Sequence, residues 1–236
     1  MPYNNLRLLS ICFATIYLLT TPWQPYPGSF IIKGLSVGLL AVLALRIGGV
    51  VSREIPILGL ALGLSSVGDI LLDINPDRLF VVGLGSFLLV HVIYSFLFLR
   101  NHPRPLMVDT PLLMVLLPLG LYVGALCAWL LPSLGGLMIP VAIYMIAIAT
   151  MVVTSILARF PTSSVMIGAI LFLISDSLLA INKFKSSVPY RDLLVWSTYY
   201  AAQYAITIGF LRAKLEPVAV PVNRPTLADS QSSSGL

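Results

Sequence analysis

Eight runs of mostly apolar residues follow one another along the chain, and most charged residues fall between these runs. Each run has roughly 16–22 residues, about the length that an α-helix needs to cross the hydrocarbon core of a bilayer. Only 10% of the residues are charged and 58% are hydrophobic, whereas an average soluble domain has about 25% charged residues. A soluble core of this size cannot bury so much apolar surface. The sequence therefore predicts an all-α integral membrane protein, a multi-pass bundle of about eight transmembrane helices.

The expected helices are separated by short segments that contain Pro, Gly or charged residues, which end helices or stay outside the hydrocarbon. These connections leave little room for a soluble domain, so we expect one transmembrane domain over residues 1–212. Residues 213–236 differ because prolines and a serine-rich end give them the composition of a disordered tail. The expected spans are 6–21, 32–51, 56–74, 79–99, 111–131, 137–158, 163–181 and 190–211.

Basic residues are distributed unevenly between the two ends of the expected bundle. Nine lie on the side of the N-terminus and five on the opposite side, so the positive-inside rule predicts that both termini are cytoplasmic. The expected location is the bacterial cytoplasmic membrane, or a membrane of the endoplasmic reticulum type in a eukaryote. Because the basic residues stand singly between spans and form no stripe, we expect no nucleic-acid partner. The sequence does not indicate an oligomeric state.

Two expected spans, the third and the seventh, end with the same pattern, a small residue followed by Asp-x-Leu-Leu-x-Ile. Asp69 belongs to the first copy and Asp176 to the second, and both spans run in the same direction. This suggests two parallel four-helix repeats related by an axis along the membrane normal. Chance similarity between leucine-rich helices is the alternative.

Asp69 and Asp176 are acidic residues inside apolar spans, about five residues from the ends of these spans. A charge in the middle of a membrane helix costs at least ~2.5–3.5 kcal/mol on insertion scales, so such a residue faces a cavity, a partner or water. Two acids at the same depth favour a shared polar site, although each could instead cap a loop or bond a neighbouring helix. Asp73 lies one turn beyond Asp69, and we interpret it as a solvated loop residue.

The fourth and eighth spans carry polar residues at the same depth. His91 follows Asp69 by 22 residues, and Thr198 follows Asp176 by the same interval. The eighth span also offers Tyr199 and, one turn further, Gln203 on the same face. A histidine that only packs and tyrosines at the membrane interface are the alternatives. Helical spacing places four residues of the fourth span on one face: Gly83, Phe87, His91 and Tyr94.

Three polar residues near the outer ends of spans could contact a lipid phosphate, namely Lys33, Asn182 and Lys183. A lysine that extends to the interface without binding a ligand is the alternative for Lys33. We expect no metal site, because the chain has only two histidines and no zinc-type cysteine spacing. No glycine-rich phosphate loop is present, and we expect no cofactor.

Four blocks of residues together cover nearly the whole chain, from the third span to the end of the eighth, with Lys33 before them. They are Gly68-Asp69-x-x-Leu72, Gly83-x-x-x-Phe87-x-x-x-His91-x-x-Tyr94, Gly168-Ala169-x-Leu171-Phe172-x-x-Ser175-Asp176-x-x-Leu179-Ala180 and Thr198-Tyr199-Tyr200-x-Ala202-Gln203. In this combination the chain resembles the YhhN-like family of lysoplasmalogenases. The resemblance implies an eight-helix membrane hydrolase that cleaves the vinyl ether bond of lysoplasmalogens. Its substrate would be a lysophospholipid in the bilayer, and its products a fatty aldehyde and glycerophosphocholine or glycerophosphoethanolamine.

Vinyl ether hydrolysis requires a proton on carbon, which creates an oxocarbenium ion that water then attacks. In glycoside cleavage, a related reaction, two carboxyl groups share this work. We therefore expect Asp69 and Asp176 to be catalytic, without assigning the acid. The alternatives are a proton-coupled transporter that uses the same acids, and a lipid-binding protein without catalysis. The expected supporting residues are His91, Tyr94, Ser175, Thr198, Tyr199 and Gln203, and the expected head-group ligands are Lys33, Asn182 and Lys183.

Overall fold

The computed structural model describes residues 2–102, 110–158 and 160–215. Within these residues the chain forms eight α-helices and no strand, as the sequence predicts. The helices are α1 (Pro2–Thr20), α2 (Ser29–Val51), α3 (Glu54–Ile74), α4 (Phe80–Arg100), α5 (Thr110–Leu130), α6 (Met138–Leu157), α7 (Ser164–Phe184) and α8 (Arg191–Leu215). Three short 3₁₀ helices follow α1 and α5: η1 (Thr21–Trp23), η2 (Leu131–Ser133) and η3 (Gly135–Leu137).

Seven of the helices in the described part, α1 to α7, are long and apolar enough to cross a membrane. Helix α8 has 25 residues, so at 1.5 Å per residue it is also long enough. Its hydropathy is lower because it carries polar side chains such as Tyr199, Gln203 and Thr207, which are buried inside the bundle. The prediction of a bundle of about eight membrane helices is therefore confirmed.

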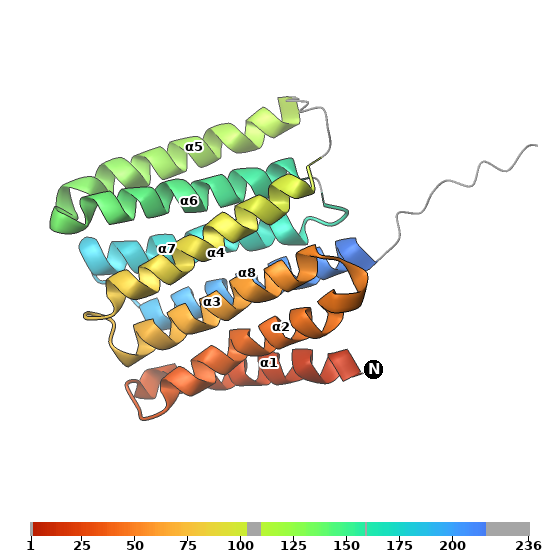
Figure 1. The fold of residues 1–236 in the computed structure, drawn as a ribbon. Helices are drawn as coiled ribbons and strands as arrows, with labels where there is room; N and C mark the ends of the chain where they lie inside the picture. Colours follow the sequence, from red (N-terminus) through yellow and green to blue (C-terminus); the bar gives the residue numbers. More distant parts are fainter. Residues whose placement is uncertain (1, 103–109, 159, 216–236) are drawn as a thin grey trace, which may run out of the picture.

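The helices lie side by side and alternate in direction, with α1 and α2 at one side of the bundle and α5 at the other (Figure 1). The connections 21–28, 75–79, 131–137 and 185–190 consequently gather at one end, at the left in Figure 1. The N-terminus lies at the opposite end. We call the end that carries these four connections the loop end. Both acidic repeat motifs lie near it.

Two glycines of the motifs permit close approaches between helices. A Cβ atom at Gly168 would lie 2.8 Å from the carbonyl oxygen of Ala202, so α7 and α8 can pack this closely only around a glycine. A Cβ atom at Gly68 would lie 2.7 Å from the ring of Phe87. The residue before Asp69 therefore has to be small for α4 to lie against α3.

The end of the bundle opposite the loop end is joined by ion pairs. Glu54, at the start of α3, accepts a hydrogen bond from Arg100 Nε at 2.9 Å and lies 2.5 Å from Lys214 Nζ. The start of α3 is thus connected to the ends of α4 and α8. Helix α8 continues to Leu215, and the rest of the predicted disordered tail, residues 216–236, lies outside the described residues.

Candidate active site

A cavity of about 310 Å³ opens near the loop end and is lined by side chains from all eight helices. Asp69 of α3 and Asp176 of α7 both line it. The structure therefore brings the two acids into one site, although they lie on helices of opposite halves of the chain. Much of the remaining wall is apolar and includes Leu126, Leu130 and Val141, which form a second hydrophobic cluster beside the main core.

Asp69 is almost fully buried and is held by α8. The hydroxyl of Tyr199 donates a hydrogen bond to Asp69 Oδ2 at 2.7 Å. The same hydroxyl oxygen lies 3.3 Å from Gln203 Nε2, which donates to it. Because the lone pairs of Tyr199 are used by this amide, its proton is directed at Asp69, and this hydrogen bond stabilises a carboxylate.

The orientation of Gln203 is fixed by further buried groups. Its Oε1 accepts the hydroxyl proton of Tyr94 at 2.6 Å, and its Nε2 donates to Ser65 Oγ at 2.9 Å. Ser65 gives its own proton to the carbonyl of Ala61, so the amide nitrogen has to face Ser65. The predicted supporting residues Tyr94, Tyr199 and Gln203 thus form one hydrogen-bonded chain that ends on Asp69.

Asp176 is held by α6 and α4. Tyr144 donates its hydroxyl proton to Asp176 Oδ2 at 2.5 Å. His91 is fully buried, and its Nε2 lies 3.5 Å from the same oxygen. Its Nδ1 lies 2.6 Å from the carbonyl oxygen of Phe87, which can only accept, so Nδ1 carries a proton. Nε2 has no hydrogen-bond partner within the described residues, and one proton shared with Asp176 would satisfy both groups.

Aromatic rings pack the partners of the two acids against one another. Phe172 contacts the His91 ring at 4.8 Å and the Tyr199 ring at 5.3 Å between centroids. Phe87 contacts Tyr199 at 5.7 Å. These edge-on contacts leave little freedom for the side chains that hold each carboxyl group.

Each acid is contacted by the last helix of the other half of the chain. Asp69 of α3 is bonded from α8, and Asp176 of α7 is contacted by His91 of α4. A two-fold axis along the membrane normal would produce this exchange. The four-helix repeat stays a prediction, with this exchange in its favour.

Lys33 of α2 also lines the cavity, with the ring of Tyr17 beside it.

The interpretation of Asp73 as a solvated loop residue is wrong. Asp73 lies in the last turn of α3, its side chain is 9% exposed, and its carboxylate is 3.8 Å from Lys33 Nζ. Tyr17 and Ser29 donate hydrogen bonds to it. Helices α1 and α2 bury this residue at the loop end.

The other two expected head-group ligands lie at the cavity mouth and already have partners. Lys183 donates to Asp77 Oδ1 at 2.6 Å, and this hydrogen bond lowers the pKa of the Asp77 carboxyl below its usual value. Asn182 Oδ1 accepts the backbone N–H of Val188 at 3.1 Å and so shapes the loop before α8.

Two expected supporting residues have structural contacts. Ser175 lines the cavity and donates to the carbonyl of Val195 at 3.0 Å, which joins α7 to α8. Thr198 bonds the carbonyl of Leu194 in its own helix at 2.7 Å and does not line the cavity. Tyr144 was not foreseen, although a single tyrosine inside an apolar span is a signal, since its hydroxyl needs a partner there.

The helices and the cavity define a class: a multi-pass membrane protein with two acidic side chains in one buried, largely apolar site. The sequence pattern of the YhhN family matches residues 28–210, which contain α2 to α7 and most of α8. The chain therefore belongs to the YhhN family, and the resemblance seen in its motifs is confirmed.

Several relatives carry the name lysoplasmalogenase. The lysoplasmalogenase of Mycobacterium tuberculosis is 35% identical over 175 residues, which are 72% of this chain and 64% of that protein. Lysoplasmalogenase TMEM86A of Bos taurus is 34% identical over 163 residues, 65% of this chain and 64% of the relative. Lysoplasmalogenase TMEM86B of Homo sapiens is 33% identical over 153 residues, which are 65% of this chain and 62% of that relative. The chain thus spans less than two thirds of the length of these relatives. No solved structure matches it.

Proposed function

We propose that this protein is a membrane-embedded hydrolase that cleaves the vinyl ether bond of lysoplasmalogens to a fatty aldehyde and a glycerophosphocholine or glycerophosphoethanolamine. The observation that carries the proposal is the presence of Asp69 and Asp176 in one cavity with a largely apolar wall. The names of the relatives support the same substrate class. Acid-catalysed cleavage of an enol ether needs a proton donor and an anionic group beside the reacting carbons.

In the proposed first step, Asp176 gives a proton to the vinyl carbon that does not bear the ether oxygen. The carbon that bears the ether oxygen then becomes an oxocarbenium ion. We assign the acid to Asp176 because His91 Nε2 lies 3.5 Å from Asp176 Oδ2 and can exchange a proton with it, whereas the Nδ1 proton of His91 is bonded to the Phe87 carbonyl. Tyr144 holds the carboxyl group in place while the proton leaves.

Asp69 takes the second role, as the carboxylate beside the cation. The hydroxyl of Tyr199 stabilises its charged form, and a negative charge in a poorly hydrated site stabilises a neighbouring cation strongly. Asp69 also accepts a proton from the water whose oxygen bonds to the cationic carbon. The resulting hemiacetal then collapses: its hydroxyl proton passes to the Asp176 carboxylate, Asp69 gives its proton to the departing glycerol oxygen, and the aldehyde is released with both acids restored.

The apolar wall of the cavity binds the hydrocarbon chain in this scheme. This wall contains Val123, Leu126 and Leu130 of α5 together with Val141 and Ile148 of α6. Helix α5 is the outermost helix beside α6 (Figure 1), so its apolar residues lie between the cavity and the lipid. A chain can therefore remain in an apolar environment while its vinyl ether reaches the acids.

Aldehyde release by the purified protein in detergent tests this function. We expect release from a lysoplasmalogen, and none from the matching saturated ether lipid, which cannot form the cation. In D₂O the aldehyde should carry one deuterium on the carbon next to the carbonyl. Substrate uptake that requires sealed vesicles, without aldehyde release in detergent, would instead support the transporter.

A further inference from the structure

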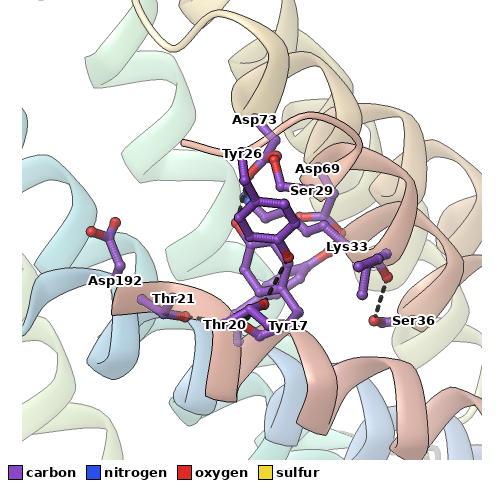
Figure 2. Close-up of polar contacts among 12 residues, drawn as sticks. Tyr17, Thr20, Thr21, Tyr26, Ser29, Lys33, Ser36, Asp69, Asp73 and Asp192 are labelled. Carbon is purple, nitrogen blue, oxygen red and sulfur yellow. Dashed lines mark hydrogen bonds and ion pairs between the residues drawn. The ribbon is translucent and has the colours of Figure 1, made fainter. Parts of the chain in front are cut away.

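A third carboxylate lies behind Lys33, apart from the two acids of the proposed chemistry. Asp73 Oδ1 accepts the hydroxyl proton of Tyr17 from α1 at 2.5 Å, and Oδ2 accepts that of Ser29 from α2. Figure 2 shows this group, with Tyr17, Ser29 and Lys33 gathered near Asp69 and Asp73 of α3. Both carboxylate oxygens are thus oriented by neutral donors from two other helices.

The Lys33 ammonium is held between this carboxylate and two aromatic rings. Its Nζ lies 3.8 Å from Asp73 Oδ1, 5.5 Å from the centre of the Tyr17 ring and 5.9 Å from that of Trp196. The two rings contact each other at 4.5 Å. The indole N–H of Trp196 donates to the carbonyl of Ala14 at 3.0 Å. The surroundings of the ammonium are therefore fixed on three sides.

This ammonium keeps its hydrogen-bond donors available. Within the described part of the chain Lys33 donates no hydrogen bond, although an ammonium group has three N–H donors. Lys33, Tyr17 and Trp196 line the cavity, whereas Asp73 does not. The ammonium therefore faces the cavity, which Asp69 also lines, whereas the Asp73 carboxylate lies behind it, so an incoming anion would bind on the cavity side of Lys33.

We propose that Asp73 is a positioning residue that holds the Lys33 ammonium at the cavity wall, where it binds the phosphate of the lysophospholipid head group. A free lysine side chain has many rotamers, and fixing it in advance removes the entropy cost that binding would otherwise carry. The identity of the lipid rests on the proposed function, whereas the anion site rests on the contacts of Lys33 alone.

Binding of two uncleavable lipids tests the proposal. One is a 1-alkyl lysophospholipid and the other is the 1-alkylglycerol with the same chain and no phosphate. We expect wild type to prefer the phosphate lipid by about tenfold, the size of one charge-assisted contact. Asp73→Asn should bring this ratio close to one and leave alkylglycerol binding unchanged. Glu54→Gln removes a lysine-paired carboxylate at the opposite end of the bundle and should keep the wild-type ratio.

A double-mutant cycle shows whether Asp73 acts through Lys33. In a Lys33→Met background, Asp73→Asn should have no further effect on the ratio. If Asp73→Asn does not fold, Tyr17→Phe provides the test, because it keeps both charges and removes one bond that orients the carboxylate. We expect Tyr17→Phe to reduce the phosphate preference partly, and Tyr122→Phe on the exposed side of α5 to keep it.

Three outcomes would overturn the proposal. Asp73→Asn could leave both affinities unchanged, or it could weaken the binding of both lipids equally; either result keeps the wild-type ratio and makes Asp73 only a structural contact. Inorganic phosphate could bind in a manner that depends on Asp73 while the two lipids bind equally well to wild type, which would assign the site to free phosphate. Aldehyde release is measured separately: its absence with an intact phosphate preference contradicts the hydrolase and leaves this inference standing.

Discussion

Tyr199 donates its hydroxyl proton to Asp69 over 2.7 Å, although the two residues are 130 positions apart. This contact joins α8 to α3 and extends through Gln203 into the middle of the bundle. It connects the two halves of the chain at the residue to which we assign the stabilisation of the cation. The hydrogen bond is therefore a direct target for mutation.

Tyr199→Phe should lower kcat because it removes the hydroxyl that stabilises the Asp69 carboxylate. A hydrogen bond to a charged group contributes about 1.5–3 kcal/mol, so we expect a fall of roughly 10- to 100-fold. The measurement is the rate of aldehyde release at saturating lysoplasmalogen. Tyr122→Phe, on the exposed side of α5, is the matched control. Equal rates for Tyr199→Phe and wild type would refute this role.

Gln203→Leu should destabilise the protein, because Tyr94, Ser65 and Tyr199 would each lose a buried partner. Unsatisfied buried polar groups cost about 1–3 kcal/mol each, and partial relaxation leaves an expected loss of about 2–4 kcal/mol. Unfolding in mixed detergent micelles measures it. Thr198→Val should change the free energy of unfolding little, since Thr198 bonds only its own helix.

Gly168→Ala should weaken the contact between α7 and α8. The added Cβ would lie 2.8 Å from the Ala202 carbonyl oxygen, and a backbone atom cannot move aside cheaply. We expect a loss of about 1–3 kcal/mol in the free energy of unfolding. Gly124→Ala in α5 is the matched control, because nothing lies within 4 Å of the added atom. A neutral Gly168→Ala would show that the helices separate without cost.

The distribution of basic residues predicts that both termini are cytoplasmic and that the loop end, with the cavity mouth, faces the other side. A fluorescent protein fused to the C-terminus of the chain should therefore be active in a bacterial host. Alkaline phosphatase fused at the same place should be inactive. The reverse result would place the cavity mouth on the cytoplasmic side.

The helices could be predicted from the sequence because the bilayer sets their length and excludes charges. Helix α8 shows where average hydropathy fails to indicate a membrane helix, because its polar side chains lower the average and would be costly to expose to lipid. This face is buried against other helices, with Tyr199, Gln203 and Thr207 at intervals of four residues. The eighth apolar run of the sequence, residues 190–211, still predicted this helix.

The partners of the acids could be predicted only in part. His91 follows Asp69 by 22 residues, and the same interval after Asp176 gives Thr198. In the structure the residue of α8 that contacts an acid is Tyr199, which donates a hydrogen bond to Asp69. The connection 75–79 has five residues and the connection 185–190 has six, so the second interval is one residue longer. A shift of one residue turns a helix by about 100° and exchanges the side chain that faces the site.

The roles of other site residues depend on contacts between helices. The position of a residue along its own span does not reveal such contacts. Asp73 was placed in solvent because it lies near the end of its span. Tyr17 and Ser29 come from two other helices to cover it. Tyr144 reaches Asp176 across the interface between α6 and α7. A single sequence shows that a buried tyrosine needs a hydrogen-bond partner, but not which helix supplies that partner.

The most direct test of the account is the rate of aldehyde release by Asp69→Asn and Asp176→Asn, each purified in detergent with wild-type folding. Each substitution keeps the size of the side chain and removes its acid function, so we expect each rate to fall by about 10²–10⁴-fold. Near-normal aldehyde release from either variant would remove that carboxyl group from the reaction and contradict the shared acidic site.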